Sequence, residues 1–174
     1  MVPLHEAMEG SVREISLRRR DPQTGESSTD TVKVRIPAGI TDGQQLRVAG
    51  HGAPGVGGGA AGDLFLRIRL EQHPDFRVHG RHLYADVDLA PWEAVLGTQI
   101  EVRLPSGKIV QVKVPEGTQA EDQLRLRGYG LPKAGGEAGD LYVVLAVKVP
   151  GEVDAEERKL WEELKQKSSF HPRE

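Results

Sequence analysis

Residues 32–54 read VKVRIPAGITDGQQLRVAGHGAP, and after a glycine run the chain continues as GDLFLRIRL at residues 62–70. The same pattern returns at residues 110–147 as VQVKVPEGTQAEDQLRLRGYGLPKAGGEAGDLYVVLAV. The two copies align at an offset of 78 residues up to Pro54 and Pro132, and of 77 residues from Gly62 and Gly139 onward. A repeat of this length is too long for one solenoid unit, so it predicts two homologous domains in one chain.

Apolar residues alternate with polar residues in both copies, which is the pattern of β-strands with one buried face. The alternating apolar positions are Val32, Val34, Ile36, Leu64, Leu66, Ile68 and Leu70 in the first copy, and Leu141, Val143, Leu145, Val147 and Val149 in the second. Such patterning over many short segments favours antiparallel sheets. We therefore expect a mainly β fold of two tandem homologous β-sandwich-like domains, domain I at residues 1–77 and domain II at residues 78–150.

A strand and a short helix precede each copy. In domain II, residues 83–97 read LYADVDLAPWEAVLG, where the alternation indicates a strand and Pro91 suits the first turn of a helix that ends near Gly97. Residues 1–10, MVPLHEAMEG, align with the end of this stretch at an offset of 87. We therefore expect domain I to lack the early part of its first strand, and the chain to be a piece of a longer protein.

The next strand of domain I is predicted at residues 12–17. Matching the glycines places Arg13, Ile15 and Leu17 in register with Ile100, Val102 and Leu104 of domain II. Residues 18–31 read RRRDPQTGESSTDT, which is polar and rich in turn formers, so we expect a solvated loop there.

Residues 151–174 change character after Pro150. Asp154, followed three residues later by Glu157, resembles a capping box, and AEERKLWEELKQK then predicts a helix of three to four turns. A lone helix of this length is marginal in water unless it packs on something. It packs either on its own domain II or on the same helix of a second subunit. We favour dimerisation, through Leu160, Trp161, Leu164 and Phe170.

Composition narrows the classes of function. The net charge of −3 gives the chain no global attraction to nucleic acid. The sequence contains no run of 18 apolar residues, so it predicts no membrane-spanning helix. The chain has no cysteine, which excludes disulfides and thiolate chemistry. It also has no asparagine, which favours a thermophilic source, although nine glutamines weaken that inference.

No motif predicts catalysis or a cofactor. The run Gly57–Gly59 would cradle a phosphate only before a helix N-terminus, and a strand follows it instead. His79 and His82 are spaced HxxH, but they lie in a polar linker without the ordered ligand set that a metal needs. We expect no enzyme, no metal and no cofactor. The basic run Arg18–Arg20 keeps DNA binding as an alternative.

Four stretches resemble the C-terminal substrate-binding region of DnaJ-type J-domain co-chaperones: VRIPAGITDGQQLRVAGHGAPG…GDLFLRI, HPDFRVHGRHLYADV, PWEAVLG and VPEGTQ…LRLRGYGLP…GDLYV. The tail, LWEELKQKSSFHPRE, is most similar to the curved-DNA-binding protein A branch of that family. The resemblance implies a cytoplasmic heat-shock homodimer that binds unfolded polypeptide and delivers it to a DnaK-type ATPase chaperone. Without cysteine the chain is similar to the zinc-free class.

The 174 residues contain no J-domain. The triplet His73-Pro74-Asp75 matches the HPD signature of a J-domain in letters only, because it follows a predicted strand where the family commonly has His-Pro-x-Phe. We interpret Asp75 as a coincidence.

The resemblance also implies a site. In the family, an extended client segment lies beside a strand of the first domain and fills a shallow apolar groove. Carried to this sequence, the groove residues are Val2, Arg13, Ile15, Leu17 and Phe76, with Ile15 and Leu17 lining it, Arg13 flanking it, Val2 on the adjacent strand and Phe76 closing it. The alternative is that Ile15 and Leu17 are core residues, as their alignment with Val102 and Leu104 suggests.

Overall fold

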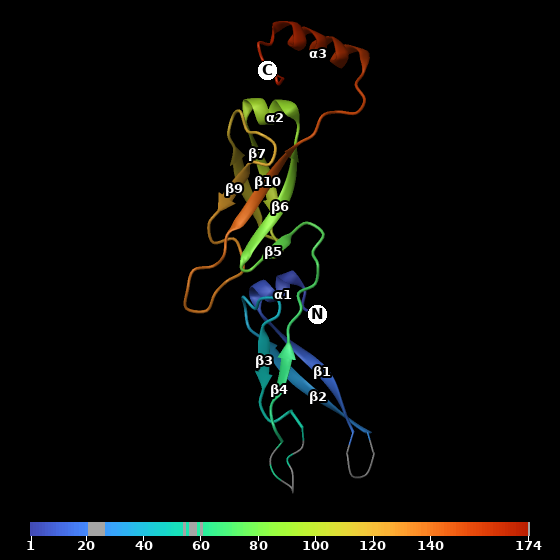
Figure 1. Cartoon of the computed structure of the whole chain (residues 1–174), viewed down its shortest axis with the longest axis vertical. Coiled ribbons are helices and arrows are strands. Elements are labelled where there is room, and N and C mark those ends of the chain that lie inside the picture. Colours follow the sequence, from blue (N-terminus) through green and yellow to red (C-terminus); the bar gives the residue numbers. More distant parts are fainter. Residues whose placement is uncertain (21–26, 54, 56–58, 60, 174) are drawn as a thin grey trace.

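The computed structural model describes the chain except for residues 21–26, 54, 56–58, 60 and 174 and the side chains of residues 19 and 20. The molecule is elongated, with domain I at one end, domain II in the middle and a helix at the far end (Figure 1). The mainly β fold is confirmed. The elements in chain order are α1 (Leu4–Glu9), β1 (Ser11–Arg20), β2 (Ser27–Ile36), β3 (Gln45–Val48), β4 (Leu64–Arg67), β5 (Arg77–His79), β6 (His82–Leu89), α2 (Pro91–Leu96), β7 (Thr98–Arg103), β8 (Ile109–Val114), β9 (Gln123–Leu126), β10 (Leu141–Val147) and α3 (Ala155–Lys167).

The repeat seen in the sequence is repeated element by element in the structure. Helices α1 and α2 both have six residues and end at a glycine with positive φ, 79° at Gly10 and 75° at Gly97, a conformation that glycine adopts without strain. The hairpins keep the predicted register, since Arg13 lies opposite Val34 in β1–β2 as Ile100 lies opposite Val112 in β7–β8. The alignment of β1 with β7 is therefore confirmed.

The sheets of the two domains differ in width. Domain II has a four-stranded sheet in the order β5-β6-β10-β9 and the hairpin β7–β8, whereas the described part of domain I has only the two pairs β1–β2 and β3–β4. The expectation of antiparallel sheets holds for the other strand pairs of the described chain but is wrong for one, because β10 pairs with β6 in parallel. The chain between these strands runs through α2, β7, β8 and β9, which is long enough for the crossover that a parallel pair needs. Domain I keeps one counterpart of this pairing, a parallel bridge between Val2 and Leu70.

The expectation of a loop is also wrong for residues 18–20 and 27–31, while residues 21–26 lie outside the described residues. Strands β1 and β2 continue their antiparallel ladder as far as the pair Arg20 and Ser27. A ladder is held by backbone hydrogen bonds, and Thr29 and Thr31 are β-branched residues that suit a strand, so no apolar alternation is required. The end of this hairpin is solvent-exposed on both faces over Ser27–Thr31.

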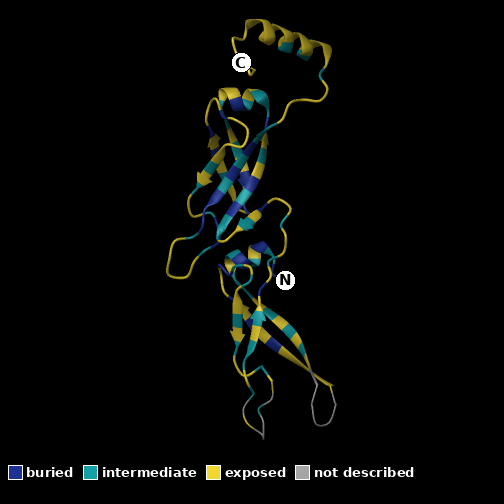
Figure 2. Ribbon diagram, in the orientation of Figure 1, coloured by how far each residue is buried: buried dark blue, intermediate teal, exposed yellow. Residues whose placement is uncertain are grey.

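One apolar core runs through both domains. The buried cluster includes Leu4 and Ile40 of domain I and Leu131, Leu141 and Leu145 of domain II. Figure 2 shows buried positions along the sheet of domain II and in α1 and β2. Among the described residues, no helix has both the length and the apolar content that crossing a membrane requires.

A polar contact joins the domains beside this core. The Arg81 Nη1 donates to the carbonyl oxygens of Gly39, at 2.8 Å, and Pro132, at 2.5 Å. Gly39 lies so close to domain II that a Cβ atom there would be 1.8 Å from the Pro132 oxygen. The two domains therefore meet through packed atoms, and Gly39 is needed for that close approach.

Candidate functional site

Strand β1 carries an incompletely covered apolar face in domain I. Arg13, Ile15 and Leu17 are half-buried on one side of the strand, while Val12 on the other side is 65% exposed. Ile15 lies opposite the buried Val32 of β2, so the partly open positions border a buried apolar strip on the same face.

Domain II shows what a fully covered version of this face looks like. Val102 and Leu104, which occupy the positions of Ile15 and Leu17, are each 5% exposed and belong to the core cluster with the four-stranded sheet. In the described part of domain I, the sheet opposite consists of β3 and β4, four residues each, and a bridge at Val2. Ile15 and Leu17 are consequently half-buried. They are less enclosed than the core residues Val102 and Leu104, but they are not fully exposed.

Arg13 is held at the α1 end of this face by three hydrogen bonds. Its Nε and Nη2 each donate to the Glu6 carboxylate at 2.8 Å, and its Nη1 donates to the Met1 carbonyl oxygen at 2.7 Å. The Ser11 hydroxyl donates to the same carboxylate at 2.6 Å. The hydrogen bonds from Arg13, and then that from Ser11, lower the pKa of Glu6 to about 2. Arg13 therefore fixes β1 to α1 and marks the end of the apolar face.

Val2 and Phe76, the other two predicted groove residues, are both buried. Val2 is 4% exposed, and its backbone donates to the Arg69 carbonyl and accepts from the Glu71 N–H. Phe76 is 5% exposed, with its ring edge-on to His73. It borders a cavity of about 1310 Å³ that is also lined by Met1, Leu70, Arg77 and Val78.

The described lining of this cavity does not include Ile15 or Leu17. The structure therefore places Val2 and Phe76 beside Leu70, and Ile15 and Leu17 along β1, with Arg13 reaching from β1 to Met1 next to Val2. Sequence reasoning missed Glu6 and Ser11, because nothing in their spacing indicates that Arg13 folds back onto α1.

Helix α3 stands at the far end of the molecule, beside α2 (Figure 1). The Asp154 side chain accepts from the Glu157 N–H at 2.8 Å, which gives the expected N-cap. The described side chains of α3 are not buried: Leu160 is 66% exposed, Leu164 55% and Phe170, beyond the helix, 76%.

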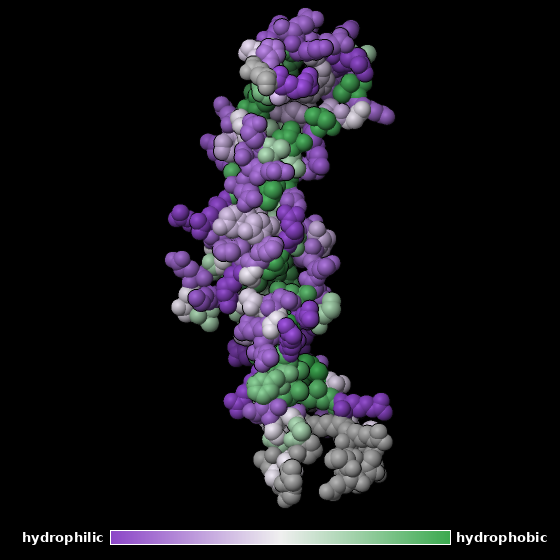
Figure 3. All heavy atoms as spheres, in the orientation of Figure 1, coloured by the Kyte–Doolittle hydropathy of each residue, from purple (hydrophilic) through white to green (hydrophobic). Residues whose placement is uncertain are grey.

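Trp161 behaves differently from the other predicted dimerisation residues. It is half-buried, its ring lies 6.5 Å from that of Trp92 on α2, and it lines a cavity of about 340 Å³ with Val149, Pro150 and Val153. The predicted dimerisation residues of α3 therefore have different surroundings. Trp161 faces its own domain II, while Leu160 and Leu164 are exposed to solvent. Trp92, Val95 and Leu96 of α2 are also exposed, and apolar atoms gather at this end of the molecule in Figure 3.

The two histidines of the HxxH spacing lie on strands, not in the linker expected for them. His79 on β5 is paired with His82 on β6, and their rings lie edge-on to Tyr84 and Tyr142 at 5.6 Å. In the described part of the chain, no three metal-ligating side chains come together. The triplet at residues 73–75 lies between β4 and β5. Gly57 and Gly58 of the glycine run are outside the described residues.

These features define a mainly β protein built from two copies of one strand pattern, with a helix at its C-terminal end. The family model described as the DnaJ C terminal domain matches residues 1–150, and the chain belongs to that family. The DnaJ-type family is one of co-chaperones.

Curated relatives share the name "Curved DNA-binding protein". A relative from Pseudomonas putida is 48% identical over 146 residues, which are 84% of this chain and 46% of the relative. One from Pseudomonas syringae pv. tomato is 41% identical over 174 residues, 98% of this chain and 55% of the relative. One from Coxiella burnetii is 39% identical over 176 residues, 99% of this chain and 55% of the relative. The chain spans about half the length of these relatives.

Proposed function

We propose that domain I binds an extended segment of a non-native polypeptide along β1, with apolar client side chains resting on Ile15 and Leu17. The observation that carries this proposal is the contrast with domain II, where the equivalent Val102 and Leu104 are covered. Strand β1 pairs only with β2 among the described strands, so its other edge offers backbone hydrogen bonds to an added strand. Backbone pairing is tolerant of client sequence, and the apolar strip favours large apolar side chains. Arg13, Val2 and Phe76 frame the groove in this proposal.

The groove is tested by Ile15→Ser combined with Leu17→Ser. We expect at least about a tenfold loss of affinity for a fluorescein-labelled, leucine- and phenylalanine-rich heptapeptide, measured by fluorescence anisotropy, because two apolar contacts are lost. Val12→Ser is the matched control, since it changes an exposed apolar residue on the opposite face of β1. Unchanged binding by the double variant, with its circular dichroism intact, would reject the groove, as would an equal loss in Val12→Ser.

The second part of the proposal is dimerisation through α3. Leu160, Leu164 and Phe170 are exposed apolar side chains at one end of the molecule, and a second copy of the same surface would cover them. Two weak grooves on one unfolded chain then raise the overall affinity through effective concentration, without any new contact. Trp161 contributes by holding α3 against α2.

Sedimentation equilibrium tests the dimer. Leu160→Ser with Leu164→Ser, and separately Trp161→Ala with Leu164→Ala, should yield monomers that hold unfolded clients more weakly. The control is Glu163→Ser with Lys167→Ser, which changes an exposed ion pair of the same helix. A dimer that persists in both apolar double variants would sink the assignment and leave packing on domain II as the role of α3.

Delivery of the held client to a DnaK-type chaperone, in the cytoplasm and during heat stress, completes the proposal. We assign stimulation of the ATPase to a J-domain, and not to residues 73–75, because that triplet lies between two strands.

Binding of duplex DNA is the second candidate function, favoured by the name of the relatives and by the basic run at residues 18–20. A steep fall of duplex affinity with salt, in a protein that ignores the apolar heptapeptide, would favour it.

A further inference from the structure

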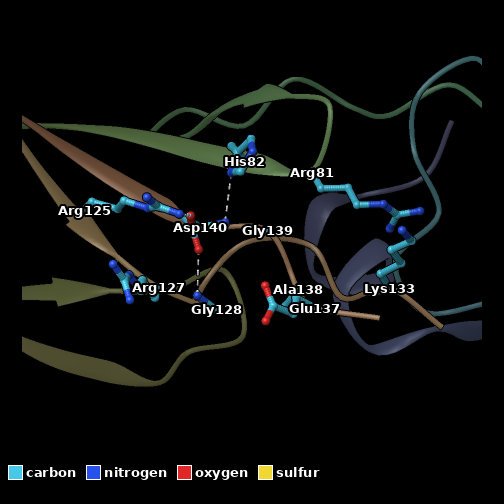
Figure 4. Close-up of a pocket in the computed structure, with 10 residues that line it drawn as sticks. All are labelled: Arg81, His82, Arg125, Arg127, Gly128, Lys133, Glu137, Ala138, Gly139 and Asp140. Carbon is cyan, nitrogen blue, oxygen red and sulfur yellow. Dashed lines mark hydrogen bonds and ion pairs between the residues drawn. The ribbon is translucent and has the colours of Figure 1, made fainter. Parts of the chain in front are cut away.

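A basic pocket of about 680 Å³ lies in domain II, next to the junction with domain I. Figure 4 shows four cationic side chains around it: Arg81, Arg125, Arg127 and Lys133. Two carboxylates, Asp140 and Glu137, lie between them in this view. The pocket is separate from the apolar face of β1 and from α3, so its function is not part of the client groove proposed above.

Part of this charge belongs to the scaffold. Asp140 accepts from the Arg125 Nε at 2.7 Å and from the Gly128 N–H at 2.9 Å. Domain I repeats the arrangement, with Asp63 accepting from the Arg47 Nε at 2.6 Å and the Gly50 N–H at 3.0 Å. The Arg–Asp–Gly arrangement joins the ends of β9 and β10 in domain II and of β3 and β4 in domain I. Because both domains have this arrangement, it is structural and gives no evidence of a ligand site in domain II.

Arg127 and Lys133 are different. Within the described part of the chain, neither is within ion-pair distance of a carboxylate. Their counterparts in domain I are Ala49 and Gly55, at the offset of 78 residues. Since domain I forms the same strands without a cation at either position, the fold does not need these two charges.

A third cation adds to the positive potential of the pocket. The Arg81 guanidinium bonds two backbone carbonyl oxygens, which leaves its charge without a carboxylate partner in the described structure. Arg127 and Lys133 lie on opposite sides of Glu137 and Asp140 in Figure 4. A single small anion would therefore reach only one side of the pocket, whereas a chain with two separated anionic groups could reach both.

We propose that this pocket of domain II binds an acidic segment of a polypeptide, with one carboxylate at Arg127 and another at Lys133. The volume suits a few side chains, whereas a duplex presents a convex surface much wider than the pocket. The net charge of −3 also opposes a polyanion as long as DNA. Glu137 lies between the two cations and opposes the incoming carboxylates, so it weakens binding and sets a threshold for how acidic a segment must be.

The probe is a fluorescein-labelled hexaglutamate peptide, titrated with the intact chain at low salt and followed by fluorescence anisotropy. Arg127→Ala with Lys133→Ala should weaken binding at least about tenfold, because two charge-assisted contacts are lost. Glu137→Gln should strengthen binding about threefold, which a merely structural residue would not do. Hexaserine should not bind, and added salt should weaken hexaglutamate binding.

The matched control is Arg103→Ala with Lys113→Ala, which removes two exposed charges from β7 and β8 of the same domain. It should keep hexaglutamate affinity within about twofold of the parent, since screening limits the reach of distant surface charges. An equal loss in this control would overturn the site, because net charge alone would then explain binding.

Failure of the parent to bind hexaglutamate, or binding of duplex DNA in its place that Arg127→Ala with Lys133→Ala abolishes, would also overturn the proposal. The apolar heptapeptide should bind all of these variants equally, so the outcome for domain II is independent of the outcome for domain I.

Discussion

Domains I and II have the same sequence pattern and the same strand register, yet they cover their apolar faces differently. Leu104 of domain II is buried under a four-stranded sheet, while Leu17 at the same place in domain I is half-exposed. Conversely, domain II has Arg127 and Lys133, which form no ion pair within the described part of the chain, where domain I has Ala49 and Gly55. The positions that the two domains share therefore maintain the common fold. The positions that differ give each domain a different surface.

The largest effect is expected from Leu104→Ala set beside Leu17→Ala. The two residues are the same type at equivalent positions, so only their burial differs. Leu104→Ala should lower the free energy of unfolding by about 3 kcal/mol, and Leu17→Ala by about 1 kcal/mol, because a half-buried leucine leaves a smaller cavity. Urea unfolding measures both. Equal losses would show that the face of β1 is as well covered as that of β7.

The next effect concerns the domain junction. Gly39 and Gly117 are equivalent and both have positive φ, 79° and 74°, but only Gly39 packs against the Pro132 oxygen. Gly117→Ala should cost about 1 kcal/mol for backbone strain alone. Gly39→Ala should cost more and should also change the angle between the domains, since the backbone must move to admit a Cβ atom. Urea unfolding and small-angle X-ray scattering check the two parts. Identical behaviour of the two variants would mean that the junction is loose.

The smallest effect is a pH dependence specific to domain I. The pKa of Glu6 is lowered from 4.5 to about 2 by Arg13 and Ser11, so the stabilisation is complete above pH 4.5 and is lost as the pH falls toward 2. Glu6→Gln should lower the free energy of unfolding by about 1 kcal/mol at pH 7, a modest value because the pair is partly exposed, and by progressively less as the pH falls through 2.

Arg13→Ile sharpens this test, because it gives domain I the residue type that domain II has at Ile100. It should remove most of the same pH-dependent stability between pH 4.5 and pH 2, because Arg13 lowers the pKa of Glu6 most and the Ser11 hydrogen bond remains. Urea unfolding at several pH values measures the window, and a parallel acid response in Glu6→Gln and the parent would contradict the assignment.

Much of the fold could be predicted because it depends on residue patterns that are local in the sequence. The alternation in β2 and β10, the proline at the start of α2 and the glycines that end α1 and α2 each act within a few residues of themselves. The internal repeat could also have revealed Arg127 and Lys133, since aligning the two copies of the sequence shows a charge in one that the other lacks. The parallel pairing of β6 with β10 could not be predicted, because period-two alternation is the same for both directions of pairing.

The candidate groove was predictable only in its positions. Ile15, Leu17 and Arg13 lie on one face of β1 as their spacing requires, but spacing does not say what lies above that face. The spacing also could not show that Arg13 hydrogen-bonds to Glu6 or that Phe76 is buried. On α3, it could not show that Trp161 lies next to Trp92 while Leu160 and Leu164 are exposed.

The sequence by itself determined two homologous β domains, their register, their short helices and the terminal helix, because backbone periodicity is set by residues two to four positions apart. Only the tertiary structure decided which apolar face is covered, that Trp161 packs beside α2, and which cations surround a common pocket. Those properties depend on residues that are distant in the chain, and the same local pattern is compatible with a covered face in one domain and an open face in the other.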